Sequence, residues 1–108
     1  MSFPMQVLLS TAGKSITGLS YIAVAHTVSP YISVYPWSAG FGTKYSDPAT
    51  LPAGTGQSVA FNPTGTAIAV ASISTPYILV YPWSAGFGTK YSDPATLPTG
   101  SGNGVAFI

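Results

Sequence analysis

One stretch of 33 residues decides the fold because it occurs twice: PYISVYPWSAGFGTKYSDPATLPAGTGQSVAFN, residues 30–62. Residues 76–108 repeat it 46 positions further on, and 27 of the 33 positions are identical. The match extends upstream, since residues 22–25 and 68–71 both read IAVA. Self-similarity at a fixed period of roughly 20 to 50 residues indicates a repeat architecture, in which one supersecondary unit is copied along the chain.

The composition indicates that one such unit does not fold alone. Apolar residues make up 46% of the 108-residue chain and charged residues only 5%, compared with roughly 25% charged residues in ordinary domains. A repeat unit buries its apolar faces against neighbouring units, and about three or more units are normally needed. Two copies in one chain therefore predict self-association.

The secondary-structure signal is entirely β. Residues 77–81, YILVY, form a β-branched and aromatic run with proline on both sides, which is typical of a short strand. Residues 66–71 alternate Ile and Val with Ala, so this strand has one bulky and one flat face; both are apolar, which predicts burial on both sides. The NPTG sequence at 62–65 predicts a type I turn, which joins 58–61 and 66–71 into a hairpin.

The rest of the period completes a four-stranded unit. A second hairpin joins 66–71 to 77–81, and a long connection leads to a weaker fourth strand at 95–98, where flanking prolines suit an outer edge. Strands of the first copy are expected at 21–25, 31–35 and 49–52. Four short antiparallel strands per unit form the blade of a β-propeller. We therefore predict an all-β fold: a β-propeller of four-stranded antiparallel blades, two blades per chain, with the ring completed by homo-oligomerisation.

Part of the repeat resembles a known family. Residues 56–69, GQSVAFNPTGTAIA, are similar to the join between blades in WD-repeat propellers, where an innermost strand ends in Val-Ala-Phe-Ser-Pro-Asp-Gly. Trp37 and Trp83 match the tryptophan that closes the third strand of that family, but the aspartate after it and the Gly-His pair are absent. The repeat also resembles propeller repeats of marine bacteriophages, and the resemblance covers residues 20–108. Near-identity of the two copies fits recent duplication and design equally well, so localisation stays open: a soluble protein, virion-associated or engineered.

Blade order divides the chain into four parts. Residues 1–19 diverge from the repeat, 20–57 form a first blade without its innermost strand, 58–103 form a second blade, and 104–108 form an innermost strand without a blade. An open strand edge is a template for pairing. We expect the C-terminal strand to pair with the first blade of the next subunit, in a head-to-tail contact that closes into a ring. The donated residues are Gly104, Val105, Ala106, Phe107 and Ile108.

The sequence leaves open which segment is the innermost strand of the first blade and how many chains form the ring. Residues 5–9 are an alternative innermost strand, with 10–19 as an enlarged turn, because Val7 and Gly13 keep the spacing of Val59 and Gly65. Propellers close with about four to eight blades, so two-blade chains form dimers, trimers or tetramers. The alanine-rich second strand lets blades approach closely near the ring axis, and the aromatic third strand fills the wider gap further out. This moderate wedge between blades favours an intermediate number of six blades, which is a trimer.

The sequence offers little for catalysis or cofactors. Gly13-Lys14-Ser15 lacks the first glycine and the helix of a phosphate-binding loop. His26 is the only histidine, and nothing in its spacing places it beside Asp47 or Asp93 as a catalytic triad requires. One histidine, two aspartates and no cysteine are too few for a metal site within one chain. We expect no enzyme activity, no cofactor and no metal.

Charge and hydropathy argue against two classes of partner. The chain has no arginine, and its three lysines are nearly balanced by two aspartates, so the phosphate neutralisation that drives nucleic-acid binding is missing. The apolar runs are far shorter than the roughly 20 residues of a membrane helix, and residues 1–13 do not resemble a secretory signal. We expect neither a nucleic-acid nor a membrane partner.

Each copy carries aromatic residues on its third strand and on the connection after it: Tyr35, Trp37, Phe41 and Tyr45, matched by Tyr81, Trp83, Phe87 and Tyr91. Aromatic faces beside polar groups suit carbohydrate stacking, and a ring makes such a site multivalent. The strand tyrosines and tryptophans are expected to pack between blades, which leaves Phe41, Tyr45, Phe87 and Tyr91 as candidate glycan contacts. The predicted function is a non-catalytic structural or interaction module that self-assembles by strand exchange, with a multivalent lectin-like propeller as the alternative.

Overall fold

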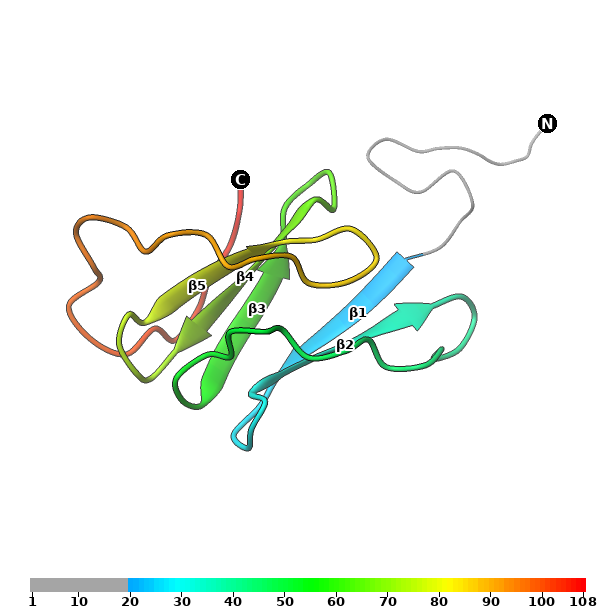
Figure 1. Ribbon diagram of the computed structural model, residues 1–108, viewed down its shortest axis with the longest axis horizontal. Helices are drawn as coiled ribbons and strands as arrows, with labels where there is room; N and C mark the ends of the chain where they lie inside the picture. The colour runs from blue at the N-terminus through cyan, green and yellow to red at the C-terminus, as the bar shows by residue number, and fades with distance from the viewer. Residues whose placement is uncertain (1–19) are drawn as a thin grey trace.

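The computed structural model describes residues 20–108, which form five short β-strands in two antiparallel sheets (Figure 1). One sheet pairs β1 (Ser20–Ala25) with β2 (Ile32–Trp37), and the other contains β3 (Gly56–Phe61), β4 (Ala67–Ser72) and β5 (Ile78–Pro82) in that order. The described residues contain no helix, so the predicted all-β class is confirmed. The predicted bounds of these strands agree with the structure to within two residues.

The predicted hairpin between β3 and β4 is confirmed. The N–H of Gly65 donates a hydrogen bond to the carbonyl oxygen of Asn62 at 3.0 Å, and Gly65 has a φ of 71°, which glycine adopts without strain. The side-chain oxygen of Asn62 accepts hydrogen bonds from the backbone N–H groups of Thr66 and Ala67, at 2.8 and 3.0 Å. Asn62 therefore satisfies the backbone donors of the turn and fixes the start of β4.

The two copies of the sequence adopt the same hairpin. Val24 lies opposite Ser33 in the first sheet, and Val70 lies opposite Leu79 in the second, as the 46-residue offset requires. In the turns, Tyr31 and its matched residue Tyr77 have φ values of 72° and 73°. The second copy differs in having β3 as an additional strand beside β4.

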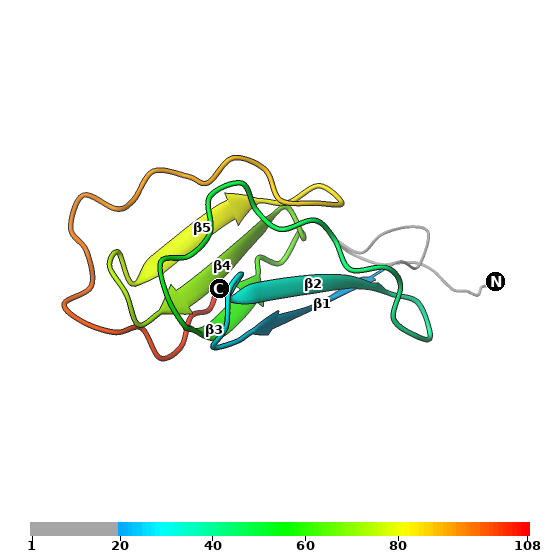
Figure 2. The same ribbon diagram turned by 60° about the horizontal axis from the view of Figure 1, so that its bottom comes forward.

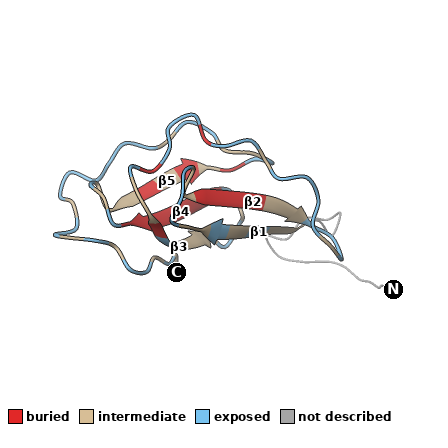
Figure 3. Cartoon of the chain, turned by 90° about the horizontal axis from the view of Figure 1, so that it is seen from below, coloured by how far each residue is buried: buried red, intermediate tan, exposed pale blue. Residues whose placement is uncertain are grey.

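The two sheets lie against each other and share one core (Figure 2). All six residues of β4 are buried, which confirms that both faces of this strand are covered. Figure 3 shows buried residues on β2, β4 and β5, whereas β1 carries exposed ones. The buried cluster consists of Ile32, Val34, Ile68, Val70, Leu79, Tyr81 and Trp83.

The predicted fourth strands, at 49–52 and 95–98, do not form. Proline on both sides of each segment removes ladder donors, which weakens any pairing there. The connections after β2 and after β5 instead follow the outer edges of their own sheets. The N–H of Tyr45 donates to the carbonyl oxygen of Val34, and that of Tyr91 to the carbonyl oxygen of Val80, both at 2.9 Å.

Residues 104–108, the predicted donated strand, form no strand within the single chain. The divergent segment 1–19, and with it the alternative innermost strand at 5–9, lies outside the described residues.

Candidate functional site

Side chains alternate along paired strands, so each sheet has two apolar faces of different shape. We call the face that carries the alanines of β1 or β4 the small face, and its opposite the bulky face. The small faces carry Ala23, Ala25, Ile32 and Val34 in the β1–β2 sheet, and Ala67, Ala69, Ala71, Ile78 and Val80 in the β3–β5 sheet. The bulky faces carry Ile22, Val24, Tyr35 and Trp37 in the first, and Ile68, Val70, Leu79, Tyr81 and Trp83 in the second.

The small face of the β1–β2 sheet packs on the bulky face of the β3–β5 sheet. Ile32 and Val34 belong to the same buried cluster as the bulky side chains of β4 and β5. Tyr21 lies on the small face in alternation with Ala23, and its ring packs edge-on against Trp83 at a centroid distance of 5.3 Å. One bulky face is therefore covered within the chain itself.

Matched side chains are buried in one copy and exposed in the other. Ile22 and Val24 are 37% and 45% exposed, whereas the matched Ile68 and Val70 are fully buried. Trp37 is 39% exposed and Trp83 only 3%. The difference follows from what covers each face, because the residue types are the same. No described residue covers the bulky face of the β1–β2 sheet in the way that this sheet covers its neighbour.

The C-terminal segment lies against the small face of the β3–β5 sheet. A Cβ placed on Gly102 would lie 3.1 Å from the Cβ of Ala71, and one on Gly56 would lie 3.1 Å from that of Ala25. Further along, the N–H of Val105 donates to the Oγ of Ser58 at 3.3 Å. Residues 102–105 thus begin to cross the small face of the β3–β5 sheet, in the same way as the start of β3 crosses the small face of the β1–β2 sheet.

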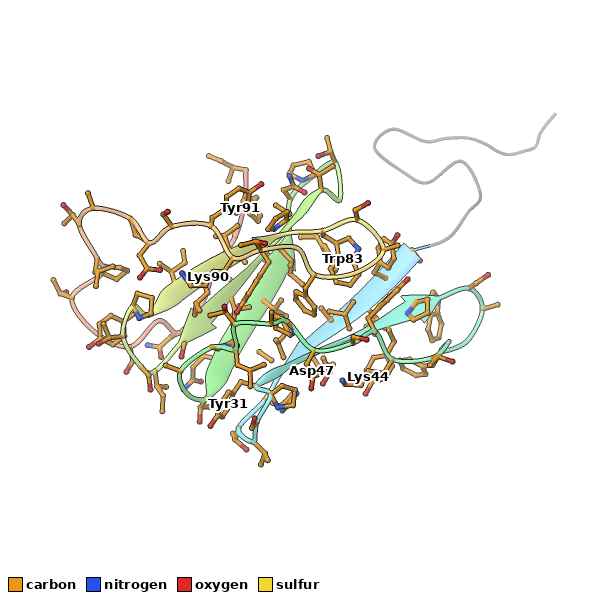
Figure 4. All side chains as sticks on the ribbon, in the orientation of Figure 1. Tyr31, Lys44, Asp47, Trp83, Lys90 and Tyr91 are labelled. Atoms are coloured by element: carbon orange, nitrogen blue, oxygen red, sulfur yellow. The ribbon has the colours of Figure 1, made fainter. Side chains whose placement is uncertain are left out.

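Trp83 occupies the centre of an aromatic cluster between the sheets (Figure 4). Its ring centroid lies 5.0 to 5.6 Å from four others, all in edge-on geometry, and these rings belong to Tyr21, Tyr45, Phe61 and Phe87. Such pairs contribute about 0.5–1.5 kcal/mol each beyond the area that they bury. The Nε1–H of Trp83 is buried and finds no acceptor among the described residues. Packing rather than hydrogen bonding therefore holds Trp83 in this contact.

Tyr81 links the bulky face of the second sheet to the connection of the first. Its hydroxyl donates a hydrogen bond to the carbonyl oxygen of Thr50 at 2.7 Å, and the residue is fully buried. Burial raises the pKa of Tyr81 to about 12. The ring therefore stays neutral as a donor far above physiological pH.

The four candidate glycan contacts have two different environments. Tyr45 packs on Trp83 from the other sheet, and Phe87 packs on Trp83 and Tyr81 of its own copy. Phe41 and Tyr91 are 66% and 52% exposed. Phe41 packs on the aromatic residues of the open bulky face, whereas Tyr91 follows β5 on the other sheet. The structure therefore does not bring the four residues together into one site.

The residues considered for acid–base chemistry stay apart. The Nε2 of His26 lies 2.9 Å from the Oγ of Ser33, just after β1, and no described contact joins His26 to an aspartate. Residues 20–108 contain no group of three side chains that could hold a metal ion. In the same part of the chain, no helix has the length and apolar character needed to cross a membrane.

Both aspartates form the ion pairs that their spacing suggests. Asp47 accepts a hydrogen bond from Lys44 and Asp93 from Lys90, each at 2.6 Å, and Figure 4 shows the first pair on the connection after β2. The carboxylates are about half exposed, so each pair contributes at most about 1 kcal/mol.

The open bulky face, including Tyr35, was not predicted as a functional surface from the sequence. The signal lay in the repeat itself, because units that stack head to tail leave the first and the last face uncovered. Comparison of the chain with known protein families, curated protein sequences and solved structures finds no match. The open bulky face is therefore the structural feature that indicates function.

Proposed function

We propose that the chain is a non-catalytic structural module that associates head to tail with copies of itself into a closed, propeller-like ring. One observation carries the proposal: the bulky face that is buried in the second copy of the sequence is open in the first. The small face of another chain's β3–β5 sheet fits this open face, because the chain already makes the matching contact internally. Such a contact joins two different surfaces of the chain, so copies add head to tail until the last one meets the first and the ring closes.

Strand donation completes the proposed contact. The edge of β1 away from β2 has no strand partner among the described residues, and an unpaired edge is a template for another strand. Val59 lies opposite Val70, and Phe61 opposite Ile68. The same register places Val105 opposite Val24 of the next copy, and Phe107 opposite its Ile22. Each chain then supplies two blades, and a trimer of six blades is the preferred ring.

The substitution Val24→Lys tests this function. It places an ammonium group in the middle of the proposed contact, where desolvation costs several kcal/mol, so we expect monomers by light scattering. The fold should persist, because Val24 is exposed in the single chain. Val28→Lys is the matched control, since Val28 is 69% exposed in the turn after β1. A Val24→Lys protein with the particle mass of the unmodified chain contradicts the proposal.

Glycan binding is the second candidate function, and the exposure of Phe41 and Tyr91 favours it. Exposed aromatic side chains present apolar faces of the kind that stack on sugars. A glycan array on the native protein tests it, with the double substitution Phe41→Ala and Tyr91→Ala as the comparison. Binding that survives both substitutions excludes these aromatics as the glycan site.

A further inference from the structure

A cavity of about 380 Å³ opens on the small face of the β3–β5 sheet. β5 forms one wall and the connection after it forms the other, and the lining residues are Ile78, Val80, Tyr91, Ser92, Asp93 and Pro94. An engineered apolar cavity of about 150 Å³ holds a benzene molecule, so this space accommodates one aromatic side chain. The inference that follows rests on the proposed function, and it concerns what fills this cavity.

The matched place in the first copy shows how such a space is filled. There the residues that correspond to Ile78, Val80 and Pro94 are all buried, and they are Ile32, Val34 and Pro48. Tyr81 belongs to the same core cluster as the first two, and its hydroxyl reaches the carbonyl oxygen of Thr50 in the adjacent connection. Tyr81, from the bulky face of the β3–β5 sheet, thus occupies the place on the small face of the β1–β2 sheet that corresponds to this cavity.

The offset of 46 residues identifies the corresponding pair at the open ends. Tyr35 matches Tyr81, and Thr96 matches Thr50. Tyr35 lies on the open bulky face, where only Phe41 packs on its ring among the described aromatic residues, at 5.4 Å. We propose that the cavity is a socket for Tyr35 of another copy of this chain, whose hydroxyl donates to the carbonyl oxygen of Thr96.

The socket also explains two features of the repeat. Leu79 on the buried bulky face is replaced by Ser33 on the open one, so a smaller side chain stands two residues before Tyr35 than before Tyr81. Asp93 in the socket wall is held by Lys90 at 2.6 Å, so its charge is compensated before the tyrosine enters. The ring therefore meets aliphatic and proline surface rather than a free carboxylate.

Photo-crosslinking tests the socket. p-Azidophenylalanine in place of Tyr35 is expected to link two chains, and the same probe in place of Tyr81 is the matched control, which should react within one chain. Trypsin cleaves after lysine, so the socket lies in peptide 91–108 and the probe at position 35 lies in peptide 15–44. These two peptides differ in mass, so they can be told apart although the two copies of the repeat are nearly identical. The expected product is an intermolecular link between these two peptides.

A second probe at position 91, in the socket wall, covers the case in which the first one weakens assembly, and it should give the same pair of peptides. An assembled particle in which both probes link elsewhere, or only to solvent, overturns the socket and leaves the proposed ring intact. If the cavity held a carbohydrate instead of Tyr35, the two probes would likewise fail to link peptides 15–44 and 91–108. A protein that is monomeric by native mass overturns both proposals.

Discussion

The hydroxyl of Tyr81 and the carbonyl oxygen of Thr50 form a 2.7 Å hydrogen bond that joins the two copies of the repeat. Tyr81 comes from β5, and Thr50 from the connection that follows β2, 31 residues earlier. Because the side chain of Tyr81 is fully buried, losing the bond would leave a buried polar group unsatisfied.

Alkaline pH should destabilise the fold through Tyr81. Its pKa is raised to about 12 in the folded chain by burial, whereas an unfolded tyrosine has a pKa of about 10. The stabilisation is complete below about pH 10 and declines as the pH rises towards 12, because the unfolded chain then releases its proton more readily. Urea unfolding at several pH values measures this. In Tyr81→Phe the decline should be smaller; an identical decline would assign it to other groups.

Ala69→Leu should destabilise the protein. Ala69 is 2% exposed on the small face of β4, opposite Ala60 and Val80, so three added carbons overpack this layer at a cost of about 1–3 kcal/mol. In a chain of this size, each kcal/mol lowers the melting temperature by roughly 4–8 °C. Ala53→Leu, in an exposed connection, is the control. An unchanged melting temperature for Ala69→Leu would place this face in solvent.

Gly56→Ala should also lower stability, for a local steric reason. A Cβ at this position would lie 2.6 Å from the carbonyl oxygen of Tyr31, a backbone atom that cannot move aside cheaply. We expect a loss of about 1–3 kcal/mol in chemical denaturation. At Gly100 a Cβ would have no heavy atom within 4 Å, so Gly100→Ala should be neutral or slightly stabilising. Equal effects of the two substitutions would show that the close approach at Gly56 is not tight.

Local patterns predicted the strands, whereas the surroundings of matched residues could not be predicted. Alternation in 66–71 and the turn at 62–65 are read over a few residues, and both gave the β3–β4 hairpin correctly. The fourth strands failed because the prolines within and just before 49–52 and 95–98 have no backbone N–H to donate to a ladder. Tyr45 and Tyr91 have the same local sequence, yet only Tyr45 meets Trp83. That difference depends on the neighbouring sheet, which no local pattern encodes.

Deleting residues 104–108 should abolish assembly without unfolding the chain. These residues form no strand in the single chain, although Val105 and Phe107 are half-buried against it. The deletion removes the strand that the β1 edge of the next copy requires. Light scattering measures the particle mass, and circular dichroism checks the fold. Thr99→Ala is the control, since Thr99 is exposed and lies outside the donated strand. A truncated protein that keeps its full particle mass would exclude strand donation.

The mass of the native particle tests the ring most directly. Native mass spectrometry of the unmodified chain should give a closed trimer, three times 11.0 kDa or about 33 kDa, which corresponds to six blades. A dimer or a tetramer would retain the head-to-tail contact and change the blade number. A stable monomer of 11.0 kDa at micromolar concentration would contradict the ring, because the bulky face of the β1–β2 sheet would then remain open in solution.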